Sequence, residues 1–93
     1  MKTYLISYDL GTPETKNDYY RIAQVIKGHI GWAKVLRSVW IIQTNRSRDE
    51  ILRNIRSVTD YNDKILVIGI TSDWISLGVS KEVTAWMPRN ILS

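Results

Sequence analysis

One acidic side chain, Asp9, lies at the end of the first apolar segment of the chain, where it could carry chemistry. Tyr4, Leu5 and Ile6 in that segment suit a buried or half-buried strand, and the Gly-Thr-Pro sequence at 11–13 indicates a turn after it. A carboxylate at the end of a strand is held rigidly and suits a hard divalent cation or an activated water. The alternative is an Asp that begins the turn by accepting a hydrogen bond from the backbone that follows it.

The sequence carries no standard active-site motif beside Asp9. Gly11 stands alone, so there is no glycine-rich phosphate loop. His29 has no neighbours at metal-ligand spacing, and we expect it to have a surface or capping role near the end of a helix. Ser38 has no His and Asp pair that the sequence places beside it, so hydrolysis by a serine nucleophile is unsupported.

A single carboxylate is too small a ligand set for a metal site. Magnesium usually takes one or two carboxylates together with waters and substrate phosphates. A homodimer whose twofold axis passes near Asp9 would bring two copies of this carboxylate together. A chain of 93 residues could then bind the metal and hydrolyse phosphodiesters with Asp9 alone, one copy coming from each subunit.

Length and composition favour one small domain over residues 1–93. The chain has no cysteine, and no apolar stretch approaches the roughly 18 residues of a membrane span. The N-terminus lacks the long apolar region of a signal peptide, so we expect a cytoplasmic protein without membrane contact. The net charge of +4 and the pI of about 9.6 are compatible with a polyanionic partner such as nucleic acid.

Strand and helix patterns alternate along the chain, and these elements must position Asp9. In chain order we expect a strand over 3–8, a helix over 15–28, one bent or two short strands over 33–43, a helix over 47–58 and a strand over 64–70. Arg37 and Ser38 interrupt the apolar run of the third segment, which is why it can be one strand or two. The run at 64–70 is continuously apolar, which is typical of a strand in the middle of a sheet.

Both helices show an apolar stripe at steps of three and four residues. The stripe of the first helix comprises Tyr19, Ile22, Ala23, Val25, Ile26 and Ile30. The stripe of the second comprises Ile51, Leu52, Ile55 and Val58. Pro13 and Glu14 suit the entry to the first helix, and Ser47 with Glu50 forms a capping box at the entry to the second.

The tail over 71–93 has a weaker pattern. We expect a loop over 73–78, followed either by a short helix from Ser80 to Trp86 that Pro88 stops, or by an extra edge strand over 83–87. Its apolar side chains must pack on the core or on a partner subunit: Trp74, Trp86, Ile91 and Leu92.

The order of elements predicts an α+β, ferredoxin-like βαββαβ core over about 3–70. Two helices would cover one face of an antiparallel sheet and leave the other face open. In so small a protein an open apolar face favours a homodimer.

Several other side chains each have two interpretations. Trp40 suits the core, whereas Trp32 either covers the end of the first helix or stacks on a nucleic-acid base. The second helix region carries arginines that are either solvated or form a phosphate-binding face. They are Arg46, Arg48, Arg53 and Arg56.

Three segments resemble the small CRISPR-associated protein family called Cas two, together with its stand-alone relatives. Residues 4–10, Tyr-Leu-Ile-Ser-Tyr-Asp-Leu, resemble the first strand of that family. Residues 35–40, Val-Leu-Arg-Ser-Val-Trp, resemble its Val-Gln-Tyr-Ser-Val-Phe segment. Residues 63–70 are similar to its last core strand.

The resemblance implies a ferredoxin-like homodimer that is either a metal-dependent nuclease on RNA or DNA, or a non-catalytic scaffold between CRISPR integrase subunits. It implies that Asp9 binds Mg²⁺, for which Mn²⁺ can substitute, with Arg37 and Ser38 near the dimer cleft. The chain departs from the family at 11–18, which is nearly neutral rather than basic, and in its tail. These departures favour a stand-alone relative and weaken the nuclease expectation.

Three functions remain open from the sequence. The first is a magnesium-dependent endonuclease that uses Asp9, Arg37 and Ser38. The second is a dimer that grips nucleic acid or a protein and cuts nothing. The third is a toxin ribonuclease similar to VapD, which resembles the same fold and also begins with a strand that ends in Asp.

Overall fold

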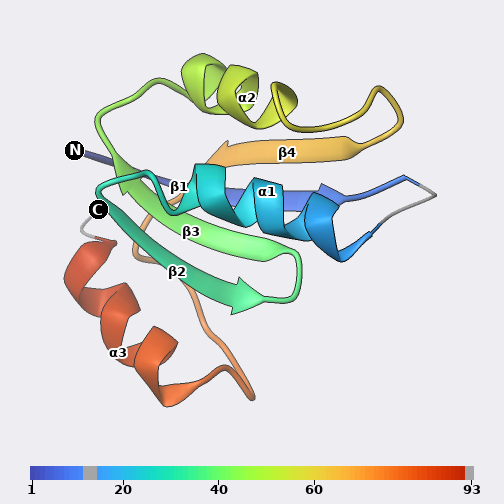
Figure 1. The fold of residues 1–93 in the computed structure, drawn as a ribbon. Helices are drawn as coiled ribbons and strands as arrows, with labels where there is room; N and C mark the ends of the chain where they lie inside the picture. The colour runs from blue at the N-terminus through green and yellow to red at the C-terminus, as the bar shows by residue number, and fades with distance from the viewer. Residues whose placement is uncertain (12–14, 92–93) are drawn as a thin grey trace.

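The computed structural model describes residues 1–11 and 15–91 as a four-stranded antiparallel sheet with three helices (Figure 1). Along the chain the elements are β1 (Lys2–Asp9), α1 (Lys16–Ile26), β2 (Gly31–Leu36), β3 (Val39–Thr44), α2 (Arg48–Arg56), β4 (Lys64–Gly69) and α3 (Lys81–Asn90). The strand order is β2-β3-β1-β4, so β1 and β3 are central. The ferredoxin-like α+β prediction is confirmed. No helix in the described ranges has the length and apolarity needed to cross a membrane.

Both helices of the core begin at capping boxes. Ser47 caps α2 and Glu50 reaches back to it, as predicted. Thr15 and Asp18 make the same arrangement at α1, which the sequence analysis missed. Pro13 and Glu14, expected at this entry, lie outside the described residues. The helix α1 ends at Ile26, before the predicted end.

The apolar run after α1 forms two strands. β2 and β3 pair in an antiparallel hairpin whose turn is Arg37-Ser38, so the two-strand alternative is correct. The register shifts between Lys34 and Leu36, which marks an irregularity close to this turn. Ile30 was expected on the buried stripe of the helix but precedes β2 and is mostly exposed.

The main core lies between the sheet and the helices α1 and α2. Side chains alternate along a strand, so Tyr4, Ile6 and Tyr8 of β1 all point to this side. They join the buried side chains of the helices and of β3, namely Ile22, Ile26, Trp40, Ile42, Ile51 and Ile55. Leu52, assigned to the stripe of the second helix, is instead exposed, and the buried part of that stripe is narrower than predicted.

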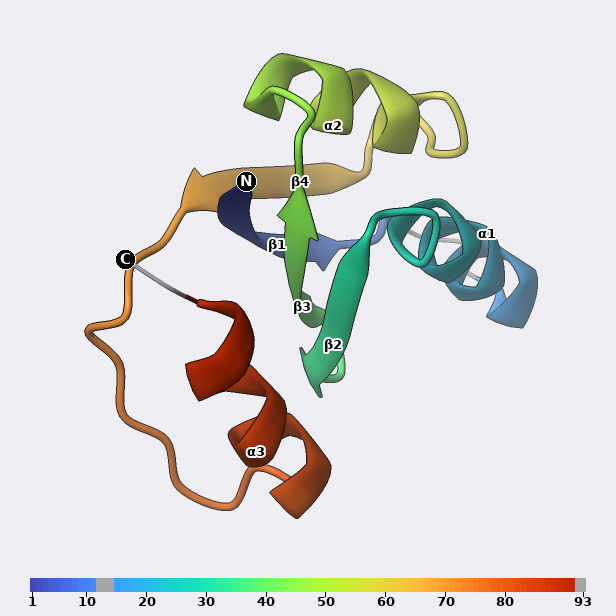
Figure 2. The same ribbon diagram turned by 90° about the vertical axis from the view of Figure 1, so that its left-hand side faces the viewer.

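A second, smaller core lies on the other face of the sheet, where α3 packs (Figure 2). It comprises Ile41, Met87 and Ile91, with Val35, Ile70, Trp74, Val83 and Trp86 packed around them. The expectation that this face is fully open is therefore wrong, because the tail folds back over part of it. Residues 83–87 belong to a helix, so the edge-strand alternative is also wrong. Leu92 lies outside the described residues.

The helix α3 continues past the residue expected to stop it. Pro88 lies inside α3, which ends at Asn90, and the amide of Ile91 donates to the Met87 carbonyl at 2.8 Å. Ser80 begins the helix by accepting from the Val83 amide, as the sequence indicated. Because proline removes only one amide donor near the end of a helix, the last turn still closes.

The strand β4 is at the edge of the sheet, not in its middle, which contradicts the prediction for this segment. Ile65 and Val67 pack against the main core, whereas Leu66 and Ile68 on the alternate positions are 56% and 49% exposed. The continuous apolar run therefore has a different origin. One set of its side chains is partly buried against the main core, and the other set lies on a face that α3 does not cover. We call the uncovered area, formed by Ser7, Asp9, Leu36, Leu66 and Ile68, the open face.

Candidate functional site

Asp9 is the last residue of β1 and its side chain is exposed. It alternates with the buried Tyr8, so it lies on the α3 side of the sheet together with Ser7. Lys64, the first residue of β4, is directly opposite Asp9 in the strand register. These residues line a shallow hollow of about 230 Å³, completed by Ile65 and Leu66. A carboxylate on a rigid strand end therefore lines a concave and accessible surface.

The chain just beyond Asp9 is held by Asp63. One oxygen of the Asp63 carboxylate accepts from the Gly11 amide at 2.8 Å, and the other accepts from the Asp60 amide at 2.7 Å. Gly11 is needed there, since a Cβ would lie 2.8 Å from the Asn62 carbonyl oxygen. In the turn hypothesis Asp9 would accept a hydrogen bond from the Gly11 amide, but this amide donates to Asp63 instead. The sequence indicated only a turn at Asp63.

Ser38 lies beside the end of β1. Its carbonyl accepts from the Tyr8 amide at 3.1 Å, which brings the Arg37-Ser38 turn to the same end of the sheet as Asp9. Arg37 is exposed and Ser38 is half-buried. The structure therefore places Arg37 and Ser38 at the same end of the sheet as Asp9, but neither lines the hollow around Asp9. Lys64, which the sequence did not indicate, does line it. Only the pairing of β1 with β4 identifies Lys64, and that pairing is not visible in the sequence.

A buried hydrogen bond supports this strand end from behind. The indole Nε1 of Trp40 donates to the hydroxyl of Tyr8 at 3.0 Å within the main core. Burial raises the pKa of Tyr8 above its ordinary value, so the phenol stays neutral beyond the physiological range. The bond joins β3 to β1 one residue before Asp9 and so helps to position its backbone.

The four arginines of the second helix region do not join Asp9. Arg53 and Arg56 line a hollow between α2 and β4 together with Leu52 and Ile65, on the opposite side of the sheet. The Arg56 guanidinium donates to the Thr59 hydroxyl and the Asp60 carbonyl, which gives it a local structural role. Arg46 and Arg48 are exposed, and the Arg48 guanidinium lies 3.8 Å from the Asp49 carboxylate. A phosphate contact by these residues would be separate from any chemistry at Asp9.

The donor set around Asp9 suits Mg²⁺ only in part. In the two described ranges, no three His, Cys, Asp or Glu side chains come together as a ligand group. Asp9 supplies one carboxylate, and Lys64, its partner in the strand register, adds a positive charge to the same hollow, which disfavours a cation there. The residues present would fit Mg²⁺ only if a second copy of Asp9 and substrate phosphate oxygens completed the coordination.

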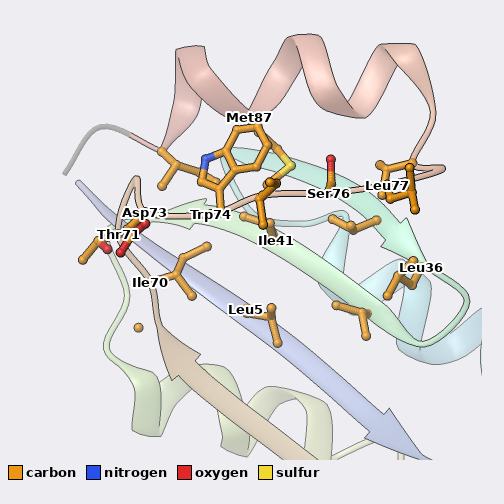
Figure 3. A pocket seen from close by; sticks show the side chains of 16 residues that line it. Leu5, Leu36, Ile41, Ile70, Thr71, Asp73, Trp74, Ser76, Leu77 and Met87 are labelled. Carbon is orange, nitrogen blue, oxygen red and sulfur yellow. The ribbon is translucent and has the colours of Figure 1, made fainter.

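At Leu36 the open face adjoins a cavity of about 560 Å³ between the sheet and the 71–79 segment (Figure 3). Thr71 and Asp73 lie at one end of this cavity, and Leu36 and Leu77 lie at the other. Leu77 and its neighbour Ile75 are almost fully exposed. Apolar side chains of β1, β2, β3 and the tail thus line this cavity.

His29 is 8% exposed, so the surface role predicted for it is wrong. Its Nδ1 lies 3.1 Å from the Thr44 hydroxyl, which also accepts from the Arg46 amide at 3.1 Å. Burial is the main cause that lowers the pKa of His29, and the Arg46 charge lowers it further.

This environment predicts that the protein loses stability in mild acid. The unfolded chain binds a proton on His29 near pH 6.5, whereas the native state resists protonation until a lower pH. The free energy of unfolding should therefore be constant above that value and fall below it, by at most about 1.4 kcal/mol per pH unit. Urea denaturation at pH 7.5 and pH 5.5 measures this change. His29→Gln should remove most of the difference, and an equal pH dependence in both proteins would contradict the assignment.

Comparison with known proteins supports the fold and leaves the function open. No protein-family model matches the chain, and no curated protein matches it. The crystal structure of a hypothetical protein TT1823 from Thermus thermophilus is similar, with a TM-score of 0.67 and 22% sequence identity. The similarity covers 84% of this chain and 92% of that one. At this identity the likeness establishes a shared fold.

Proposed function

We propose that the chain works as a homodimer through its open face and hydrolyses phosphodiester bonds of RNA or DNA, as a stand-alone relative of the Cas two family. The observation that carries the proposal is the position of Asp9 on a concave part of the same face as the exposed Leu66 and Ile68. Burying these side chains against a second copy would remove apolar surface from water and bring two Asp9 carboxylates toward one interface.

In this proposal the residues at the end of β1 have different roles in metal binding and phosphate binding. Two Asp9 carboxylates would hold Mg²⁺, which supplies charge neutralisation at the phosphate and an activated water. Arg37 is exposed at the adjacent turn and can pair with phosphate oxygens. Ser38 can donate a hydrogen bond to a phosphate oxygen. The Lys64 ammonium opposite Asp9 can also bind phosphate.

A cleavage assay tests the proposal. Wild-type protein, Asp9→Asn and the control Asp73→Asn are incubated with single-stranded RNA or double-stranded DNA, in Mg²⁺, Mn²⁺ or EDTA. Asp73 is an exposed carboxylate beyond the other end of β4. We expect metal-dependent cutting by the wild type and by Asp73→Asn, and a loss of at least about a hundredfold in Asp9→Asn. Cutting that survives in Asp9→Asn would contradict the role of this residue.

A non-catalytic dimer that binds nucleic acid is the second candidate. The Lys64 ammonium favours it, because a cation opposite the one carboxylate weakens metal binding and strengthens phosphate binding. Absence of cutting by the wild type, combined with binding that weakens steeply with salt and is unchanged in Asp9→Asn, would establish this function. Genes beside the coding sequence would separate a role with a CRISPR integrase from that of a toxin similar to VapD.

A further inference from the structure

The outer edge of β2 carries a cluster of aromatic and cationic side chains that is separate from the hollow around Asp9. Trp32 is 40% exposed there, and the Lys27 ammonium lies 5.1 Å from the centre of its ring. Lys34, two residues along the same strand, lies with its ammonium 5.6 Å from the ring of Trp40. The Trp32 and Trp40 rings are themselves in contact, with centroids 5.6 Å apart.

A shallow hollow of about 260 Å³ runs along this edge. It is lined by Trp32, Ala33, Lys34, Glu82, Val83 and Trp86. Trp86 reaches this edge from α3 and lies against Gly31, where a Cβ would come 3.4 Å from its Cζ2 atom. Two tryptophans from different elements thus border one hollow, with a lysine beside it. The hollow is slightly smaller than the cavities of about 300–1,000 Å³ that hold drug-sized ligands.

We propose that this edge binds a single-stranded nucleic acid, with one base stacked at Trp32 and the flanking phosphates bound by Lys27 and Lys34. Aromatic side chains combined with a cationic track are the usual means of binding single strands without sequence preference. A duplex keeps its bases stacked inside, so it cannot use the tryptophan. Glu82 repels phosphate, which directs the backbone to the lysine side of the hollow.

The interaction energies favour replacement of the Lys27 ammonium by a stacked base on the Trp32 ring. An exposed cation–π contact such as that of Lys27 stabilises by about 0.5–1 kcal/mol, whereas stacking of a base contributes about 1–3 kcal/mol. The displaced ammonium then pairs with a phosphate. The Lys27 ammonium therefore lies over the Trp32 ring in the free protein. In the complex it binds the phosphate backbone of the strand.

This inference rests on the proposed function to the extent that both take nucleic acid as the partner, but the two use different sites. Asp9→Asn should stop cleavage and leave binding at the β2 edge unchanged. A change in Trp32 should weaken binding whether or not the protein cuts. Failure of one proposal is thus distinguishable from failure of the other.

Fluorescence anisotropy with labelled 12-nucleotide single strands of RNA and DNA, and with the matching duplexes, tests the site in EDTA. The variants are Trp32→Leu, which keeps an apolar cover over Trp40, and the double variant Lys27→Gln with Lys34→Gln. Controls are Tyr61→Leu and Lys16→Gln, which change an exposed aromatic and an exposed cation elsewhere. Thermal melting confirms that each variant is folded.

We expect single strands to bind more tightly than duplexes. Trp32→Leu should raise the single-strand dissociation constant by at least about fivefold, the lower end of the stacking range. The lysine double variant should weaken binding and make its salt dependence shallower, and neither control should do so. Adenosine monophosphate as a competitor distinguishes a site for free nucleotides from a site for a strand. If the site recognises a strand, the bound strand is displaced only at far higher concentrations of the nucleotide than if it recognises a free nucleotide. Equal duplex affinity, no single-strand binding, or binding indifferent to Trp32 and both lysines would overturn the proposal.

Discussion

Replacing Leu66 and Ile68 together by Asp is expected to convert the proposed homodimer into monomers, with a dissociation constant raised at least about a hundredfold. Both side chains are about half exposed in the single chain, so the double substitution should leave the monomer folded. In a twofold interface each substitution occurs twice, so four carboxylates would enter a surface that must be desolvated. Sedimentation velocity over a range of concentrations measures the change.

The control for this experiment is Leu52→Asp. Leu52 is also exposed and apolar, but it lies on α2, on the opposite side of the sheet from the open face. It should leave the dimer intact. A wild-type protein that stays monomeric at about 100 μM would remove the dimer from the proposal, and dissociation caused equally by Leu52→Asp would move the interface to the helical side.

Local signals of the fold were predictable from the sequence, because they depend on neighbours along the chain. The capping box of Ser47 and Glu50 follows from a spacing of three residues. Arg37-Ser38 within an apolar run indicated either a bend in one strand or the turn between two strands that the structure has. The order of elements was then sufficient for a ferredoxin-like prediction, which the structure confirms.

Features that depend on contacts between distant segments could not be predicted. A continuous apolar run is compatible with a central strand, but β4 is an edge strand whose second apolar set lies on the open face. The burial of His29 depends on Thr44, fifteen residues later, and no periodicity encodes that contact. Pro88 indicated the end of a helix, although packing of Met87 and Ile91 on Ile41 holds α3 together through it.

At the candidate site, too, what the chain shows locally was predictable and what depends on distant contacts was not. Asp9 was selected from its position at the end of an apolar strand, and Arg37 and Ser38 from the resemblance to the Cas two family; the structure places all three at one end of the sheet. Lys64 was not selected, because its position opposite Asp9 depends on strand pairing. The arginines of α2 were candidate partners by charge alone, but Arg53 and Arg56 line a hollow on the helical side of the sheet, away from Asp9.

Trp40→Ala is expected to lower the free energy of unfolding by about 3–5 kcal/mol, and by more if the Tyr8 hydroxyl loses its partner without access to water. Trp40 is 2% exposed and belongs to the main core, so its removal leaves a cavity there. A domain of this size has roughly 5–15 kcal/mol of stability in total, so the variant should be largely destabilised at 37 °C. Urea denaturation measures the change.

Two further variants separate packing from hydrogen bonding in this prediction. Trp40→Phe keeps most of the ring but removes the Nε1 donor, and Tyr8→Phe removes the hydroxyl that accepts from it. Each should cost about 1–3 kcal/mol, because each leaves one buried polar group without its partner. The double variant should cost less than the sum of the two, since it removes both polar groups at once. Strict additivity would show that this bond does not couple β3 to the end of β1, and the backbone before Asp9 would then depend on strand pairing and packing.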